Sequence, residues 1–316
     1  MTDARDWEAL FDTEAGNEHP GWMSGVLCQR AATTRAGDML YIASYPIWNT
    51  QTGRRAAGIT PTKAAQKRVN DRRAKLRLEM LINHNFGEGD LLITCTYRDE
   101  EQPRNPEEAH RDIRNYVARI RRLRQRKGLS EIKYIYVTET TQSKRRGVRY
   151  HHHLIMNSEG LSREEAEKAW QQQARSRGIV GICNSRRAQP TEEGLSGWAH
   201  YITKQSGKAD EENGKGIGTR RRWCRSRNLK IPETRVSDKR ISRRRVERIV
   251  LDIEAQAKLV FEQIYPGYEL VDCKVRESSY VPGAYIRARM TRKTRRTINP
   301  VLGKTMGRGK KNPLPG

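Results

Sequence analysis

The chain has 316 residues, with 62 Lys or Arg against 37 Asp or Glu, so its formal net charge is +25. An excess of that size points to a polyanionic partner such as a nucleic acid. No run of about 18 apolar residues could span a bilayer, and the acidic start MTDARDWEALFDTEAG lacks the apolar segment of a signal peptide. Five scattered cysteines without a CxxC pair argue against a disulfide framework or a zinc ribbon. We expect a soluble protein of a reducing compartment with no membrane partner.

Residues 1–88 are expected to form an N-terminal extension made of two strands and a basic helix. The strands are expected at 25–30 and 39–45, on either side of the turn-like TTRAGD. The helix is expected at 62–82, because Pro61 stands before its first turn. The sequence leaves open whether this part is a domain of its own or wraps on the next one.

Residues 89–232 are expected to form an α+β domain. Apolar strands are expected at 91–97, 133–139, 148–156 and 178–183, with helices at 105–128 and from Ser162 to about residue 174. The second helix opens with the capping-box pair Ser162 and Glu165. The order predicts a ferredoxin-like split β-α-β-β-α-β antiparallel sheet with both helices on one face. The other face is left for a site or for the further helix that we expect at 192–205.

The C-terminal part is divided into 233–290 and 291–316. The first segment is expected to hold one long amphipathic helix, 242–264, and strands at 268–275 and 280–290. The last segment is basic and rich in Gly and Pro, which predicts a disordered tail attracted to phosphate. A GxxxxGK[ST] loop is absent from the sequence, so no nucleotide cofactor is expected.

Two histidines and a glutamate are predicted to meet on one face of a hairpin. Side chains alternate along a strand, so in RYHHHLIM His151 and His153 share a face while His152 points the other way. If the strand pairs with its predecessor around Arg145, Glu139 lies directly opposite His151. Two imidazoles and one carboxylate suit Zn, Fe, Mn or Co, which would act as a Lewis acid at a phosphate. The alternative is that these rings only pack or hydrogen-bond within the sheet.

GLSGWAHYITKQ carries a candidate nucleophile. At helical spacing, Leu195, Ala199 and Ile202 form a buried stripe, and Tyr201 lies off its centre. Lys204 is three residues further on, close enough to reach the same phosphate or to stabilise a phenolate. A phenol has a pKa of about 10 and needs such help to act as a nucleophile. From this pattern alone, a packed tyrosine beside a surface lysine is the simpler interpretation.

Together these residues resemble rolling-circle replication initiators of the HUH endonuclease superfamily, in their single-tyrosine phage and plasmid form. LLITCTY is similar to the first motif of that family, HHHLIM to its histidine–hydrophobic–histidine motif, and YITK to its tyrosine–x–x–lysine motif. His152 stands where a bulky apolar residue is more usual, and Glu139 falls where the family often has its third ligand. The resemblance covers about residues 91–232.

The resemblance implies site-specific nicking of single-stranded DNA at a replication origin. Mg or Mn held by Glu139, His151 and His153 would polarise the scissile phosphate, and Tyr201 would attack it. Tyr201 would keep the 5′ end as a phosphotyrosine, and the freed 3′-OH would prime synthesis. The same site could rejoin strands, and a host helicase would unwind the duplex in the cytoplasm of a bacterial host cell.

Basic and aromatic residues near the site are expected to contact the DNA. RRRWCRSRNLKIP resembles the basic, Trp-containing segment that follows the tyrosine in many bacterial and phage members, and the hairpin loop SKRRG is basic as well. The DNA-binding residues expected from these two segments are Arg145, Arg146, Arg220, Arg221, Arg222, Trp223, Arg225, Arg227 and Lys230.

Three other interpretations stay open at this point. A relaxase or transposase would use the same chemistry to mobilise DNA. A nonenzymatic nucleic-acid binder could use the same sheet, although RNA-recognition modules place aromatic residues where this chain has His151 and His153. An ordinary metal-dependent nuclease would use water, leaving Tyr201 a structural role.

Overall fold

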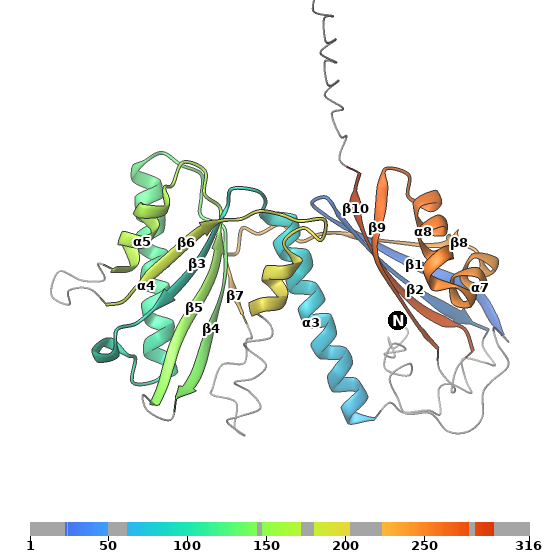
Figure 1. The fold of residues 1–316 in the computed structure, drawn as a ribbon, viewed down its shortest axis with the longest axis horizontal. Coiled ribbons are helices and arrows are strands. Elements are labelled where there is room, and N and C mark those ends of the chain that lie inside the picture. The colour runs from blue at the N-terminus through green and yellow to red at the C-terminus, as the bar shows by residue number, and fades with distance from the viewer. Residues whose placement is uncertain are drawn as a thin grey trace, which may run out of the picture.

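The computed structural model describes residues 23, 25–49, 62–143, 147–171, 180–202, 223–277 and 282–293. These residues form two five-stranded antiparallel sheets, with the orders β6-β3-β5-β4-β7 and β8-β1-β2-β10-β9. A long helix, α3 (Lys63–Asn85), lies between the two sheets (Figure 1). None of the helices in the described part of the chain is long and apolar enough to cross a membrane.

The first sheet confirms the expected β-α-β-β-α-β order. Its parts are β3 (Leu91–Thr96), α4 (Pro106–Arg126), β4 (Tyr134–Ser143), β5 (Gly147–Met156), α5 (Arg163–Gln171) and β6 (Cys183–Arg187). The short β7 (Cys224–Arg225) pairs with the outer edge of β4, and a 3-10 turn, η1 (Asp99–Glu101), follows β3. Asn105 caps α4, and Ser162 and Glu165 exchange the two hydrogen bonds of a capping box at α5. The last strand of this order is displaced from the expected 178–183, because β6 runs from Cys183 to Arg187 and overlaps that range only at Cys183. Gly181 instead passes the backbone of Thr96 so closely that a Cβ atom would clash.

Each face of the first sheet packs against helices. One face packs against α4 and α5 through Ile113, Tyr116 and Trp170, as expected for a split βαβ arrangement. The opposite face packs against α3 and against a helix at residues 196–202. The helix that carries Tyr201 therefore lies on the sheet face left free by α4 and α5.

The N-terminal and C-terminal extensions share the second sheet. It consists of β1 (Val26–Ala36), β2 (Met39–Trp48), β8 (Thr234–Ile241), β9 (Tyr268–Glu277) and β10 (Ala284–Arg292). Two helices, α7 (Arg243–Leu251) and α8 (Ile253–Ile264), bury one face of it around Val246 and Phe261. The single helix expected at 242–264 is wrong: it is interrupted at Asp252, whose carboxylate accepts from the backbone N–H of Ala255 at 3.0 Å and starts α8.

The position of α3 explains why its apolar residues follow no single stripe. Leu78, Leu81 and Ile82 pack on the first sheet. Leu76 and Met80 pack on the second sheet, against Met39 and its neighbours. A helix between two sheets must present an apolar surface in two directions, so its pattern differs from that of a helix lying on one surface.

Candidate active site

The register of β4 and β5 is the one that the sequence predicts. Glu139 pairs with His151, and Ser143 pairs with Gly147 at the end of the hairpin. Gly147 has a φ of +67°, the left-handed conformation that glycine adopts without strain at the end of the loop. The carboxylate and the two imidazoles of His151 and His153 therefore belong to one face of the sheet, because opposed residues share a face.

His153 and Glu139 are in direct contact on that face. The Nε2 atom of His153 lies 3.0 Å from Oε2 of Glu139, and the two side chains are only 5% and 8% exposed. The other ring nitrogen, Nδ1, lies 3.3 Å from the hydroxyl of Thr94 on β3. Contacts at both nitrogens fix the orientation of the ring, with Nε2 turned toward the carboxylate.

His152 points to the opposite face and belongs to the core. Its Nε2 lies 2.8 Å from the hydroxyl of Tyr97 and its Nδ1 lies 2.9 Å from the hydroxyl of Thr138. Its ring also packs edge-on against Trp170, with centroids 5.5 Å apart. Burial lowers the pKa of His152 to about 3, so the ring is neutral at ordinary pH.

His151 completes the predicted ligand set from a half-buried position. Its pKa is lowered mainly by burial; the charge of Glu139 opposes this shift, while His153 and Arg149 add to it. A neutral imidazole is the form that binds a metal ion. The lowered pKa of His151 favours this neutral form.

The chemistry of this donor set fits a divalent ion, although the three groups are not drawn together around one point. Two imidazoles and a carboxylate on one sheet face are suitable ligands, and the contact from Thr94 to the second nitrogen of His153 resembles the support that metal-bound histidines receive. Within the described ranges, no group of three or more His, Cys, Asp or Glu side chains is arranged to hold a metal ion. Glu139 and His153 instead share a hydrogen bond.

Tyr201 stands next to this face. Leu195, Ala199 and Ile202 are buried, as the helical spacing predicts, whereas Tyr201 is 49% exposed. Its ring meets the ring of His153 edge to face, with centroids 5.3 Å apart and planes at 89°. The structure thus brings together Glu139, His153 and Tyr201. Lys204, predicted to assist Tyr201, lies outside the described residues.

The start of the Tyr201 helix is fixed by two polar side chains of α3. The amide oxygen of Asn83 accepts from the backbone N–H of Leu195 at 2.7 Å, and the hydroxyl of Ser196 donates to Glu79 at 2.6 Å. Gly194 passes Asn83 so closely that an added Cβ would clash with the amide oxygen. Neither residue can be singled out from the sequence, because Glu79 lies among the many charged residues of the helix expected at 62–82 and Asn83 lies one position beyond that helix.

Glu79 is the centre of a buried polar cluster that joins α3 and the helix of Tyr201 to the second sheet. It accepts from the hydroxyl of Tyr41 on β2 at 3.0 Å and pairs with Arg289 of β10 at 3.4 Å. His200, the neighbour of Tyr201, pairs with it at 3.2 Å. Burial opposes ionisation of Glu79, but the hydrogen bonds from His200 and Ser196 and the charge of Arg289 hold its pKa below the usual value. The hydrogen bond to Glu79 raises the pKa of His200 despite its partial burial.

The expected DNA-binding residues are only partly described. Arg145, Arg146, Arg220, Arg221 and Arg222 lie outside the described residues. Trp223 is half-buried against the core beneath α3, Arg225 and Arg227 are exposed beside the edge of β4, and Lys230 is exposed near the end of α3. The exposed cations have the access that a phosphate contact needs, while Trp223 supports the fold.

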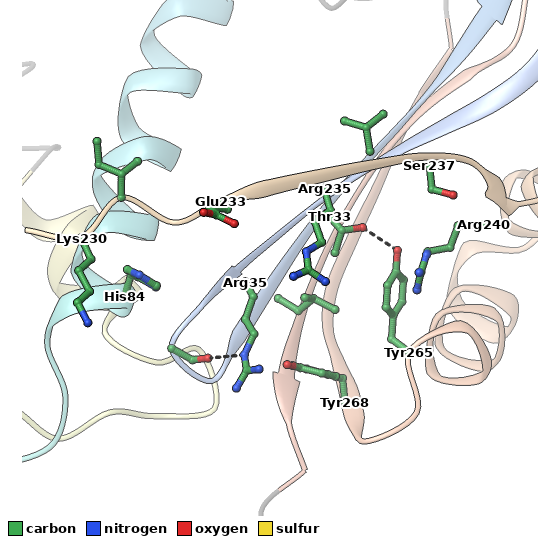
Figure 2. A pocket seen from close by; sticks show the side chains of 14 residues that line it. Thr33, Arg35, His84, Lys230, Glu233, Arg235, Ser237, Arg240, Tyr265 and Tyr268 are labelled. Atoms are coloured by element: carbon green, nitrogen blue, oxygen red, sulfur yellow. Dashed lines mark hydrogen bonds between the residues drawn. The ribbon is translucent and has the colours of Figure 1, made fainter.

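Lys230 lines a large cavity between the end of α3 and the second sheet (Figure 2). The cavity has a volume of about 1110 Å³. On its far side, the hydroxyl groups of Tyr265 and Thr33 share a hydrogen bond of 2.9 Å. The guanidinium of Arg240 lies 5.4 Å from the centre of the Tyr265 ring. The tyrosine ring is thus held in the wall, and in this view Arg35 lies between Lys230 and Tyr265.

Comparison with known proteins finds one related family. Residues 90–206 match the family model of the replication-associated protein ORF2. The matched segment runs from the start of β3 through the helix of Tyr201, so it includes Glu139, His151 and His153. No curated protein and no solved structure matches the chain. The match supports a replication initiator protein with a role in DNA replication.

Proposed function

We propose that the chain nicks a single strand of DNA at a replication origin and holds the new 5′ end on Tyr201. The observation that carries the proposal is the contact between the Tyr201 ring and His153, which in turn contacts Glu139. The family match supports replication initiation, and the net charge of +25 supports a nucleic-acid substrate. A host helicase would supply the unwound strand.

Transfer to Tyr201 conserves the number of phosphate ester bonds. The phenolic oxygen attacks the phosphorus atom and releases its proton, a new phosphorus–oxygen bond forms, and the bond from phosphorus to the 3′ oxygen breaks. The 3′ oxygen takes up a proton and becomes the primer hydroxyl. Reversal of these steps rejoins the strand, so water and an external energy source are not consumed.

The described residues provide orientation for this step. The exposed half of the Tyr201 ring leaves room for a phosphate, while contact with His153 limits the directions in which the ring can turn. Glu139, His151 and His153 would hold Mg or Mn, and the bound ion would withdraw negative charge from the phosphate oxygens. Anchorage of the helix to α3 keeps Tyr201 at this face.

The test is covalent capture of DNA. Wild-type protein, Mn and labelled single strands of random sequence should give a protein–DNA conjugate that survives denaturing electrophoresis, and Tyr201→Phe should give none while still binding the strands. Tyr268→Phe is the matched control, because Tyr268 belongs to the second sheet, and it should give wild-type conjugate. A conjugate formed by Tyr201→Phe would assign the nucleophile to another residue. Cleavage without any conjugate would favour a water-dependent nuclease.

A further inference from the structure

A second basic surface lies away from the sheet face of His151 and His153. A groove of about 450 Å³ runs between α3 and the second sheet, on the sheet face opposite α7 and α8. Figure 1 shows α3 beside this sheet, with α7 and α8 on the far side. The wall that α3 provides includes Arg72, Arg73 and Lys75. The wall that the sheet provides includes Lys274, Arg276 and Arg287.

The alternation of β10 explains how one strand serves two environments. Ile286, Ala288 and Met290 point into the core under α7 and α8. Arg287 and Arg289 lie between them in sequence and line the groove instead. The chain therefore places cations on the sheet face that helices α7 and α8 leave uncovered.

The pairing of β9 with β10 places like charges opposite each other in the groove. Arg287 is the direct partner of Lys274. Like charges opposed across two strands are destabilising. The acidic residues that line the groove are Glu79 and Asp272. Both pair with Arg289, at 3.4 and 3.5 Å, and Asp272 also lies 4.0 Å from Lys274. Seven Lys and Arg side chains line the groove with only these two carboxylates, and a polyanion lying there would neutralise the excess positive charge.

We propose that this groove binds the phosphate backbone of duplex DNA that flanks the cleavage site. His200 lines the groove, and the next residue, Tyr201, contacts His153 on the first sheet. DNA held between α3 and the second sheet therefore lies beside the helix of the nucleophile. That placement relative to the cut rests on the proposed function of Tyr201, whereas binding in the groove does not.

The groove is suited to a backbone more than to unpaired bases. Proteins that bind single strands offer free aromatic faces for stacking. Here the ring of Tyr285 is stacked on Tyr45 with centroids 6.2 Å apart, and the guanidinium of Arg287 lies 5.5 Å from the Tyr285 ring. The hydroxyl of Tyr41 contacts Glu79 and Asn83 within the buried cluster. The two rings are thus engaged within the protein, and most of the charged side chains that line the groove are Lys and Arg, which suit phosphate.

The test compares two double variants of equal charge, each in the Tyr201→Phe background so that binding is measured without cutting. Lys274→Gln with Arg287→Gln removes an opposed pair in the groove. Arg244→Gln with Arg245→Gln removes the same charge from α7, on the other side of the sheet. Affinity for a labelled duplex of random sequence, and for a single strand of the same length, is measured over a range of salt concentrations.

The groove variant should bind duplex about tenfold more weakly, and its plot of log affinity against log salt should be shallower by about two. Its melting temperature should stay close to that of the parent, so that the loss of affinity is not a loss of folding. The α7 variant should match its parent. Unchanged duplex affinity and slope, an equal loss in the α7 variant, or a loss confined to the single strand would each overturn the proposal. If the Tyr201→Phe parent formed conjugates, the proposed nucleophile would fail while the binding comparison still stood.

Discussion

The ring of Tyr201 meets the ring of His153 edge to face, although the first residue belongs to a helix and the second to β5. His153 also contacts Glu139 through Nε2. It is thus the one described side chain seen to touch both the predicted nucleophile and a second predicted ligand. This double contact makes His153 more sensitive to substitution than His151.

We expect His153→Ala to lower the rate of conjugate formation by about a hundredfold or more, since several kcal/mol of phosphate stabilisation and the orientation of Tyr201 are lost together. His151→Ala should lose only the phosphate stabilisation, so its rate of conjugate formation should fall less than that of His153→Ala. The measurement is single-turnover conjugate formation at saturating DNA. His110→Ala, on α4 at the opposite face of the first sheet, is the control and should stay near the wild-type rate. Equal impairment of the two histidine variants would contradict a separate orienting role.

Divalent metal should also be detectable without catalysis. An ion that binds the folded protein alone raises its stability, by about 2.7 kcal/mol at a hundredfold excess over the dissociation constant. Adding Mn to chelator-treated protein should therefore raise the melting temperature, and Glu139→Gln should weaken this response while keeping the residue volume. Lack of any Mn-dependent shift in the wild type would remove the metal from the proposal.

The sequence is sufficient to predict the first sheet and the face of its candidate site. Alternation along RYHHHLIM and the register across the hairpin depend on local geometry, so Glu139 opposite His151 can be predicted without any tertiary information. The off-centre position of Tyr201 likewise follows from helical spacing. Contact between Tyr201 and His153 cannot be predicted in this way, because it depends on how the helix docks on the sheet.

The second sheet is harder to predict because its assembly also depends on tertiary contacts. Strand β8 has mostly exposed residues, so no apolar alternation marks it. β1 and β2 form a local hairpin, but their outer partners β8 and β10 are far away in the sequence, and that pairing is set by the packing of the whole chain. Glu79 is the clearest case: within a helix rich in charged residues, nothing distinguishes it from a surface carboxylate, yet it is 3% exposed.

Glu79→Gln should reduce activity by misplacing the Tyr201 helix. The carboxylate is shared by Ser196 and His200 of that helix and by Tyr41 and Arg289 of the second sheet. The amide keeps the volume but loses the charge that faces His200 and Arg289, a change that typically costs about 1–3 kcal/mol of folding free energy. We expect the rate of conjugate formation at saturating DNA to fall, with little change in affinity for a single strand.

Glu88→Gln is the control for that substitution, since Glu88 is exposed just beyond α3. It should leave both the rate and the stability unchanged. A Glu79→Gln protein with full activity and reduced stability would limit the cluster to a purely structural role. Loss of affinity without loss of rate would instead indicate that Glu79 acts on the groove.

His152 should make the protein sensitive to acid. Its folded-state pKa is about 3 because of burial, against an ordinary value of 6.5. Between these values the unfolded chain binds a proton that the native protein does not, so stability falls as the pH drops below 6.5. From pH 7 to pH 5 the loss from this one residue amounts to about 2 kcal/mol.

His152→Leu should abolish that part of the pH dependence. The leucine leaves the hydroxyls of Tyr97 and Thr138 without the ring, which costs about 1–3 kcal/mol at any pH. The free energy of unfolding in urea should therefore be lower than in the wild type at pH 7 and closer to it at pH 5. His200→Gln provides a contrast, because the pKa of His200 is raised and the stability it contributes is lost as the pH increases. If wild type and His152→Leu lost equal stability on acidification, His152 would have to be protonated in the native protein, contrary to its burial between Tyr97 and Thr138.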